Sequence, residues 1–184
     1  LLPALWHPVL LAQTLATVEL ISGGRLVIGA GVGGAFNDDQ KREWEVAGVP
    51  PKGRGRRFEE IIEIVEGLGS GEPYTFHGRD FDLDATLMRP VPARDGGVPF
   101  LLASHYRAQS QAQIRRAARL GAGIISISDT PDEFAQVIQQ VAKKTAELGR
   151  DPAGLENTFY MTVNMEPDLK KAESDAVEWL TGYY

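Results

Sequence analysis

The stretch WHPVLLAQTLATVELISGGRLVIGAGVGGAFN, residues 6 to 37, decides the fold. After Pro8, apolar residues recur at helical spacing, and proline suits the first position of a helix. Gly23-Gly24 ends that helix, and the short apolar run Leu26-Val27-Ile28 then has the composition of a strand covered on both faces. A glycine-rich loop follows from Gly29 to Asn37. This order predicts a strand end, a helix, a strand and a loop of a parallel α/β fold.

The rest of the chain repeats the alternation of helices and strands. Helices are expected over residues 38–47, 54–68, 109–120, 131–148 and 168 to the C-terminus, strands over 98–103, 122–128 and 157–165, and a small hairpin over 74–83. Thr130-Pro131-Asp132-Glu133 combines a helix cap, a proline and an acid, which fixes one helix start. Strands that alternate with helices indicate βαβ units and a parallel sheet.

Composition limits the classes of function. The 184 residues suffice for one domain, and 43% of them are hydrophobic, as in ordinary soluble globular proteins. A formal net charge of −6 without long basic runs gives no sign of a basic surface that would bind the phosphate backbone of nucleic acid. The absence of cysteine excludes disulfides and thiolate metal sites, and no apolar run is long enough to cross a membrane. The cytoplasm is the expected location.

The number of strands leaves two architectures open. Leu1-Leu2-Pro3 reads as the tail of a strand that has already begun, so the chain is expected to be part of a longer one. With that partial strand before Trp6, five strands of the main sheet are predicted, fewer than the eight of a closed barrel. Either the sheet is open or three units of a barrel are missing.

The glycine loop contains G-x-G-x-x-G from Gly29 to Gly34, which is the spacing of dinucleotide-binding loops. In such loops the last glycine opens an apolar helix whose N-terminus meets a pyrophosphate. Here Asp38 and Asp39 follow instead, so an NAD-binding Rossmann site is the weaker interpretation. Glycines at a strand end also let a flat ring lie against the backbone, and a flexible turn is the competing explanation.

Several motifs together resemble one enzyme family. They are Trp6-His7-Pro8, Leu15-Ala16-Thr17, Ser22-Gly23-Gly24-Arg25-Leu26, Ile28-Gly29-Ala30-Gly31, Arg57-Phe58-Glu59-Glu60-Ile61, Phe76-His77-Gly78, Arg89-Pro90-Val91-Pro92 and Thr130-Pro131-Asp132-Glu133-Phe134. This combination resembles the bacterial-luciferase-like oxidoreductases, which use FMN or the deazaflavin F420. The similarity extends over nearly the whole chain, residues 1–184.

The resemblance implies a fold. The family has a (β/α)8 TIM barrel with insertions, so residues 1–184 are expected to form a single luciferase-like barrel domain that contains strands 3 to 7 with their helices. Strands 1, 2 and 8, in the N- and C-terminal units, would be missing. The count of five strands agrees with this interpretation.

The resemblance also implies a site. In such barrels, ligands lie at the carboxyl ends of the strands. The loops after strands three and four approach the flavin or deazaflavin ring, and the loop after strand five approaches the cofactor phosphate. The residues of this chain predicted to bind FMN or F420 are therefore Trp6, Gly31, Val32, Gly33, Asn37, Ala103 and Ser104.

His7 is the predicted catalytic residue. It lies at a strand end before a helix, where an imidazole could titrate near neutrality and transfer a proton beside the ring. A packed histidine at the start of that helix is the alternative. His105 is a candidate for contact with a phosphate or substrate, and His77 is expected to be a hairpin turn residue. Three dispersed histidines predict no metal site.

Two positions depart from the family pattern. Gly34 stands where F420-dependent sugar-phosphate and alcohol dehydrogenases commonly carry a glutamate, so those substrates are not expected. Ala103-Ser104 stands where many relatives have two glycines; the serine hydroxyl could still bind phosphate, whereas the added Cβ atoms hinder close approach.

The predicted function is that of a flavoprotein or F420-dependent oxidoreductase, or a luciferase-like monooxygenase, that acts on a small organic substrate. The glycine loop favours F420 slightly over FMN. A barrel relative that binds flavin without catalysis is the first alternative, and a Rossmann dehydrogenase is the second. The expected partners are a small-molecule substrate and, in a homodimer, a second copy of the chain, without nucleic acid or membrane.

Overall fold

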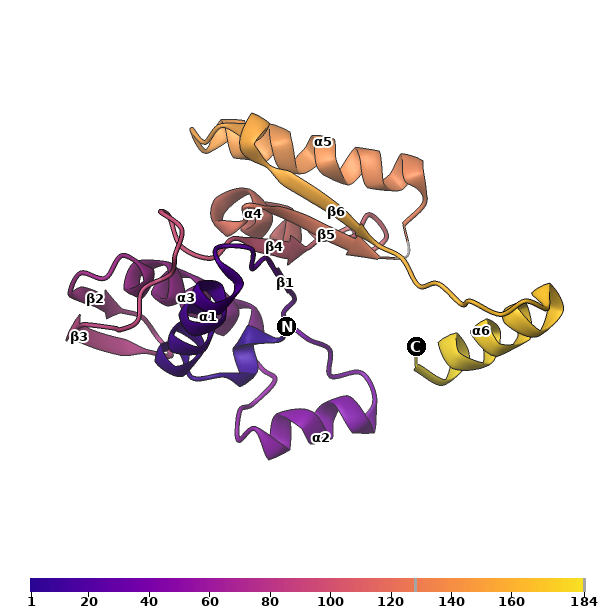
Figure 1. Ribbon diagram of the computed structural model, residues 1–184, viewed down its shortest axis with the longest axis horizontal. Coiled ribbons are helices and arrows are strands. Elements are labelled where there is room, and N and C mark those ends of the chain that lie inside the picture. The colour runs from indigo at the N-terminus through magenta and orange to yellow at the C-terminus, as the bar shows by residue number, and fades with distance from the viewer. Residues whose placement is uncertain (128, 184) are drawn as a thin grey trace.

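The computed structural model describes residues 1–127 and 129–183, and its centre is a parallel sheet of four strands (Figure 1). The strand order is β1-β4-β5-β6. Ile28 pairs with Phe100, Leu101 with Gly123, and Gly123 with Glu156. The strands are β1 (Ile28–Ala30), β4 (Phe100–Ala103), β5 (Gly123–Ile127) and β6 (Glu156–Tyr160).

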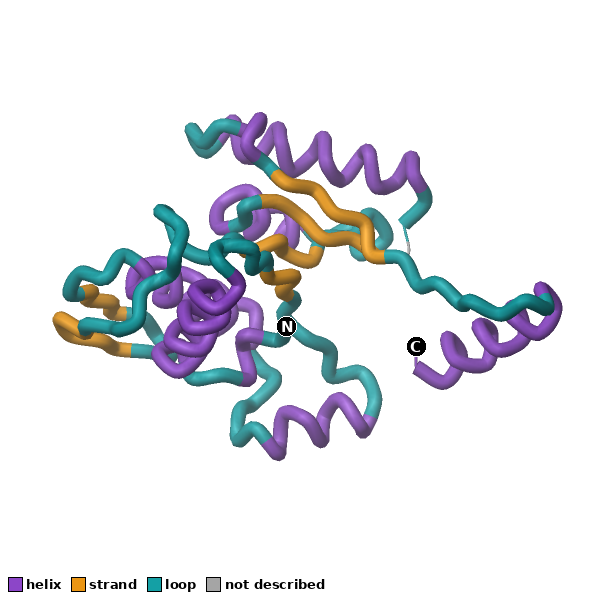
Figure 2. The backbone as a smooth tube through the Cα atoms, in the orientation of Figure 1, coloured by secondary structure: helices purple, strands orange, loops and turns teal. Residues whose placement is uncertain are grey.

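Helices connect the strands of the sheet and pack on one another in chain order. Contacts join α1 to α3, α3 to α4, and α4 to α5. Figure 2 shows the alternation of helices with strands along the tube. The helices are α1 (Pro8–Ser22), α2 (Asp38–Val46), α3 (Arg54–Gly69), α4 (Gln111–Leu120), α5 (Pro131–Glu147) and α6 (Leu169–Tyr183). The parallel sheet and crossover helices confirm the predicted α/β class.

The helix ends follow the sequence signals. Pro8 begins α1, and Gly23 ends it in the left-handed conformation with φ of 64°, which glycine adopts without a steric penalty. Thr130 caps α5 by accepting a hydrogen bond from the backbone N–H of Glu133, whose side chain in return accepts from the N–H of Thr130. These local bonds satisfy donors that the first turn of a helix leaves free.

The strand predicted before Trp6 is confirmed only at Leu1. Residues Pro3–Leu5 form a short 3-10 helix, in keeping with a proline whose fixed φ suits the first position of a helical turn. Only Leu1 keeps strand-like bonding: its amino group donates to the carbonyl of Gly29, and its carbonyl accepts from the N–H of Gly31. This is the bonding pattern of a parallel neighbour of β1.

Two other strand boundaries differ from the prediction. Strand β1 begins at Ile28 and includes Gly29 and Ala30, so the expected start at Leu26 is two residues early. Strand β6 ends at Tyr160, whereas the prediction extended it to Met165. Residues 161–165 are exposed, so their apolar side chains are not evidence of a buried strand. The prediction for the strand over 122–128 includes Ser128, which lies outside the described residues.

The core lies between the sheet and helices α1, α3 and α4. The buried side chains include Leu11, Phe58, Ile61, Leu102 and Ile124. Burial of apolar surface at roughly 25 cal/mol per Å² is the main stabilising term of such a core. It fixes the strands whose carboxyl ends form the site described below.

A buried ion pair joins the end of α1 to the segment before β4. Glu19 is fully buried and accepts hydrogen bonds from Arg94 Nε at 2.7 Å and from the N–H of Leu26 at 3.0 Å. The hydrogen bond from Arg94 holds the pKa of Glu19 below its usual range, which favours the charged carboxylate. This pair positions the chain that enters β1.

The hairpin is a separate antiparallel sheet, as predicted. Strands β2 (Tyr74–His77) and β3 (Asp82–Thr86) pair with each other. His77 Nδ1 lies 2.5 Å from Asp82 Oδ1, and both side chains are exposed. His77 is therefore the last residue of β2, paired with Asp82 of β3, and the expected position in the turn is wrong.

The last elements are much less covered than the first. All five residues of β6 are exposed, and α6 lies away from the sheet at the end of an extended segment (Figure 1). Across the described residues, no helix is long and apolar enough to span a membrane.

Candidate functional site at the strand ends

The carboxyl ends of β1, β4 and β5 border a cavity of about 250 Å³. Gly29 and Gly31 line it from β1 and its loop, and Ala103 lines it from β4. Ile125 and Ile127 of β5 and Tyr160 of β6 are also among its lining residues. Because parallel strands end at one edge of a sheet, segments far apart in the sequence meet here.

The two glycines of β1 and its loop keep this cavity open. A Cβ atom at Gly29 would lie 3.1 Å from Ile125 Cδ1, whereas one at Gly31 would lie 3.5 Å from the Ala103 Cβ, an ordinary contact. A side chain at either position would occupy space beside the backbone of β1. The predicted residues Gly31 and Ala103 therefore lie together at the edge of the sheet.

Donors from α2 and α3 hold the loop after β1. Trp44 is fully buried, and its Nε1 donates to the carbonyl of Gly34 at 2.7 Å. Arg54 Nε donates to the carbonyl of Gly33 at 3.0 Å. Gly33 has φ of 77°, which strains any other residue. The loop is thus fixed by hydrogen bonds, and Val32 packs against the hydrophobic core.

Asn37 has a structural role that the sequence prediction did not include. Its Oδ1 accepts a hydrogen bond of 2.9 Å from the N–H of Gln40 and so caps α2. The Oε1 atom of Gln40 in turn accepts from the N–H of Phe36 at 2.8 Å. The predicted contact of Asn37 with a cofactor stays a prediction, in addition to this capping bond.

Ser104 is buried and unsatisfied. Its N–H donates to the carbonyl of Ile125 at 3.1 Å. Among the residues that the structure describes, its Oγ is a buried side-chain oxygen without a hydrogen-bond partner. An unpaired buried hydroxyl is costly, so a polar group from a ligand or a water molecule is the expected partner.

A polar chain connects the ends of β4 and β5. Ser126 Oγ donates to Asp129 Oδ2 at 2.5 Å, and the N–H of Tyr106 donates to both oxygens of Asp129 at 3.2 and 3.1 Å. His105 Nδ1 accepts from the N–H of Ile127 at 3.3 Å and lies 3.4 Å from Ser126 Oγ. The sequence analysis named His105 but missed Ser126, because a serine inside a predicted strand carries no signal of its own.

Burial sets the protonation of His105. It lowers the pKa of the His105 imidazole, and the negative charge of Asp129 acts in the opposite direction. Because the N–H of Ile127 donates to Nδ1, the neutral form carries its proton on Nε2. His105 is therefore a neutral hydrogen-bond donor at pH 7.

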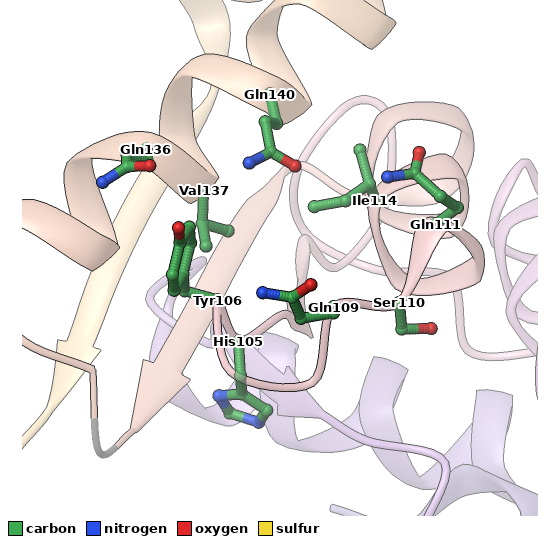
Figure 3. Close-up of a pocket in the computed structure, with 9 residues that line it drawn as sticks. All are labelled: His105, Tyr106, Gln109, Ser110, Gln111, Ile114, Gln136, Val137 and Gln140. Atoms are coloured by element: carbon green, nitrogen blue, oxygen red, sulfur yellow. The ribbon is translucent and has the colours of Figure 1, made fainter.

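A second cavity of about 240 Å³ lies between α4 and α5. Figure 3 shows Gln136 and Gln140 of α5 on one side and Gln109 and Gln111 on the other, with the His105 ring directed away from these glutamines. His105 lines both this cavity and the one at the strand ends. The side chains of the second cavity are mostly polar and uncharged.

Trp6 and His7 lie beside the hairpin. The ring of His7 stands edge-on to Phe81 with 6.0 Å between centroids, and Arg57 lies over the same Phe81 ring at 4.5 Å. Arg57 also donates to the carbonyl of Trp6 at 3.5 Å. His7 begins α1 without a side-chain capping bond. These contacts agree with the packed alternative for His7, and its catalytic role stays a prediction.

Two polar residues lie past the last strand. Asn164 Nδ2 donates to the carbonyl of Ala172, and Glu166 pairs with Lys171 at 3.2 Å. Asn164 is exposed and Glu166 is half-buried, and both are bonded within the segment that leads to α6. Over residues 1–127 and 129–183, no group of three or more histidine, cysteine, aspartate or glutamate side chains is placed to hold a metal ion.

Parallel strands with crossover helices and a cavity at their carboxyl ends define an α/β protein, and TIM barrels have these features. The model of the luciferase-like monooxygenase family matches residues 1–184, and the chain belongs to this family. The predicted resemblance and the barrel fold are thereby confirmed.

The chain is similar to curated relatives and to solved structures. It is 34% identical over 143 residues to an uncharacterized protein of Mycobacterium tuberculosis, covering 78% of this chain and 46% of that protein. It is 31% identical to the F420-dependent glucose-6-phosphate dehydrogenase of Beutenbergia cavernae, covering 95% of this chain and 50% of that enzyme. An F420-dependent secondary alcohol dehydrogenase solved with an F420-acetone adduct superposes with a TM-score of 0.77 at 24% identity, covering 95% of this chain and 51% of that one.

The chain thus spans about half the length of the relatives it matches. Two of these proteins depend on F420, in agreement with the predicted choice between F420 and FMN. The Rossmann alternative is wrong. Asp38 and Asp39 are exposed in the first turn of α2, and the segment directly after Gly34 is not a helix.

Proposed function

We propose that this chain contributes part of the cofactor site of an F420- or FMN-dependent oxidoreductase that acts on a small organic substrate. The single observation that carries the proposal is the cavity at the strand ends, where Gly29 and Gly31 leave space beside the backbone of β1. F420 is the preferred cofactor because two of the similar proteins depend on it. A location in the cytoplasm and a homodimer remain predictions.

The lining of the cavity suits a flat ring. Ile125 and Ile127 supply apolar surface, and Ala103 is small enough to leave room above β4. Ligand sites are commonly concave and mostly apolar, with a few polar groups that fix orientation. The cofactor would supply the hydride or oxygen chemistry, and the protein would position it.

Individual roles follow from these positions. Gly31 and Ala103 would contact the ring directly, while Val32 and Gly33 would hold the loop after β1 in place through the core and through Arg54. The unpaired Ser104 Oγ would donate to a polar atom of the cofactor. His105 Nε2 would donate a second hydrogen bond from the border of the cavity.

The proposal also includes Trp6 and His7. Both follow the short helix at Pro3–Leu5, and their contacts lie with Arg57 and Phe81. A proton transfer by His7 requires the cofactor or substrate to extend from the cavity to the hairpin. His7→Gln should then lower turnover and leave ring binding unchanged.

The test of the proposal is titration of the chain with F420 and with FMN, followed by ring fluorescence. Gly31→Ala should weaken binding of the ring at least tenfold, because the added methyl group points into the cavity. The substitution should fold normally, since its Cβ makes only an ordinary contact at 3.5 Å. Gly154→Ala is the matched control, because a Cβ there meets nothing within 4 Å. If neither F420 nor FMN binds, the proposal is refuted.

The second candidate is a barrel relative that binds the ring without catalysis. Gly34 favours it, because a glycine has no side chain that can transfer a proton. Bound cofactor that is neither reduced nor oxidised by a panel of alcohols, aldehydes and sugar phosphates would support this candidate. Turnover with any of these compounds would exclude it.

A further inference from the structure

The side chains of the first turns of α3 bind segments that are far apart in the sequence. Arg54 Nε donates to the carbonyl of Gly33 at 3.0 Å, in the loop after β1. Arg57 Nε donates to the carbonyl of Ala4 at 2.9 Å, in the segment before His7. Because Arg54 and Arg57 are three residues apart, they project from neighbouring positions on the helix surface. One side of α3 therefore holds both segments that are predicted to contact the ring.

Arg57 makes three contacts at once. Besides its bond to Ala4, Nη2 donates to the carbonyl of Trp6 at 3.5 Å, and the guanidinium lies 4.5 Å from the centroid of the Phe81 ring. A planar guanidinium can donate to two acceptors and stack on an aromatic ring together, whereas the ammonium group of lysine cannot. Arg57 thus fixes the backbone on the N-terminal side of His7 at two carbonyls.

The hairpin completes the surroundings of His7. The His7 ring stands edge-on to Phe81, with 6.0 Å between the ring centroids. Glu60, which is only 7% exposed, accepts hydrogen bonds from the N–H of Arg79 at 3.0 Å and from the N–H of Asp80 at 2.9 Å. These bonds hold the hairpin turn on α3, directly before Phe81 in the chain. The same helix therefore places both the backbone before His7 and the aromatic ring beside it.

The charge of Arg57 strengthens these bonds. Burial lowers the pKa of Arg57, and the negative charges of Asp80 and Glu60 act in the opposite direction. An arginine side chain stays charged in proteins, and a charged donor makes a stronger hydrogen bond than a neutral one. The acceptors, the carbonyls of Ala4 and Trp6, are uncharged backbone groups. The bonds therefore fix the position of a backbone segment rather than neutralise a charge.

We propose that Arg57 is a positioning residue, which holds Trp6 and His7 on the same helix that holds the loop after β1 through Arg54. The separation between the two segments that are predicted to contact the ring is then set by α3. The inference rests on the proposed function, because it concerns the arrangement of the same cofactor site.

The physical reason is that Trp6 and His7 have little else to hold them. Trp6 is 41% exposed and His7 is exposed, so packing in the core does not fix their side chains. His7 also makes no side-chain capping bond at the start of α1. A segment that is free to move has to be ordered when a ligand binds, and this ordering lowers the affinity. Arg57 removes part of that cost before the ring arrives.

The test uses titration with F420 and with FMN, followed by ring fluorescence. Arg57→Met keeps most of the length of the side chain but removes all its donors, and it should weaken binding of the ring at least fivefold. Arg57→Lys keeps the charge and loses the planar group that reaches two carbonyls, so it should weaken binding at least threefold. All titrations are made well below the melting temperature of each variant, so that a loss of stability alone does not change the affinity.

Arg56→Met is the matched control on the same turn of the helix. The Arg56 side chain is 48% exposed and reaches Asp80 only at 4.0 Å. Within residues 1–127 and 129–183, it donates no hydrogen bond to a backbone group. Its substitution should change the affinity for the ring less than twofold. Binding by Arg57→Met that equals binding by the unmodified chain would overturn the inference.

A second readout distinguishes this inference from the proposed function. NMR of the His7 imidazole, assigned with His7→Gln, is recorded without any ring compound. Arg57→Met should shift the His7 resonances, because the ring current of Phe81 depends on how the two rings are placed, and Arg56→Met should leave them unchanged. If neither F420 nor FMN binds, the proposed function fails and these resonances alone decide the inference. His7 resonances that are the same in Arg57→Met and in the unmodified chain would refute it in either case.

Discussion

The loop after β1 and the loops after β4 and β5 meet at one edge of the sheet but are held in opposite ways. In the first loop, Trp44 and Arg54 donate hydrogen bonds to backbone carbonyls of Gly33 and Gly34. In the second region, Asp129 accepts hydrogen bonds from a backbone N–H and a serine hydroxyl. The acceptors in the first region are therefore uncharged backbone carbonyls, whereas the acceptor in the second region is a buried carboxylate.

This difference indicates how one cavity can treat the two ends of a ligand differently. Glycine and small apolar residues at β1 leave room for a ring. At β4 and β5 the N–H of Tyr106 and the hydroxyl of Ser126 already donate to Asp129. Four predictions, from the largest expected effect to the smallest, test whether the two regions are held as described.

The largest effect is expected for Trp44→Ala. This change empties a fully buried site and removes the donor to Gly34, so the free energy of unfolding should fall by about 3–5 kcal/mol. Urea denaturation measures the loss. Phe36→Ala is the control on the same loop, because Phe36 is 83% exposed and should change stability by less than about 0.5 kcal/mol. Similar losses for both variants would contradict the description of the first loop.

Ser126→Ala and Ser104→Ala test the second region as a pair. Both serines are fully buried, but only Ser126 has a side-chain hydrogen bond, to Asp129. Ser126→Ala should destabilise the chain by about 1–3 kcal/mol, because it removes a donor from a buried carboxylate. Ser104→Ala should leave stability unchanged or raise it by up to about 1 kcal/mol, because its oxygen is unpaired. The reverse order in thermal or urea unfolding would show that the partners are wrongly assigned.

Gly33→Ala tests the conformation of the first loop. The residue has φ of 77°, and a Cβ would lie 3.0 Å from Trp44 Cζ2, so a loss of about 1–2 kcal/mol is expected. Gly31→Ala is the comparison, because its φ is ordinary and its Cβ contact is 3.5 Å. Its free energy of unfolding should change by less than about 0.5 kcal/mol. Equal losses of stability in Gly33→Ala and Gly31→Ala would mean that the positive φ of Gly33 does not cause the destabilisation.

The smallest effect concerns the titration of His105. Its folded pKa lies below the ordinary value, because burial outweighs the opposing charge of Asp129. The folded chain then binds fewer protons than the unfolded chain, so this contribution to stability is complete above about pH 6.5 and is lost as pH falls below that value. Asp129→Asn should lower the pKa of His105 further, whereas Asp132→Asn should leave it unchanged. The measurement is an NMR titration of the imidazole resonances, with the His105 signal assigned from its loss in His105→Gln. A His105 pKa above 6.5 would contradict the prediction.

Much of the fold could be predicted from local chemistry. Pro8 and Gly23 bound α1, and the capping pair of Thr130 and Glu133 begins α5, because these signals act within a few residues. The end of the strand before Trp6 could not be predicted, because Pro3–Leu5 form a 3-10 turn and only Leu1 bonds to β1. Of the two glycines that line the cavity, Gly31 was predicted through the family resemblance, whereas Gly29 was not.

The hydrogen-bond partners at the site could not be read from the sequence. Ser126 and Asp129 are close in the chain, but Tyr106 and His105 reach them from another strand end, 21 to 23 residues away. Asn37 was predicted to contact the cofactor, and the structure shows in addition that it caps α2. Such assignments depend on backbone geometry that only packing fixes.

The sequence by itself determined the α/β class, the order of the helices and the family, because periodicity, caps and motifs are properties of neighbouring residues. Only the tertiary structure decided that the carboxyl ends of β1, β4 and β5 share one cavity, and that Asp129 accepts hydrogen bonds from Tyr106 and Ser126. The physical reason is that burial and hydrogen bonding between distant segments arise when the sheet brings its strand ends together. The sequence alone does not show which donor will form a hydrogen bond with each carboxylate.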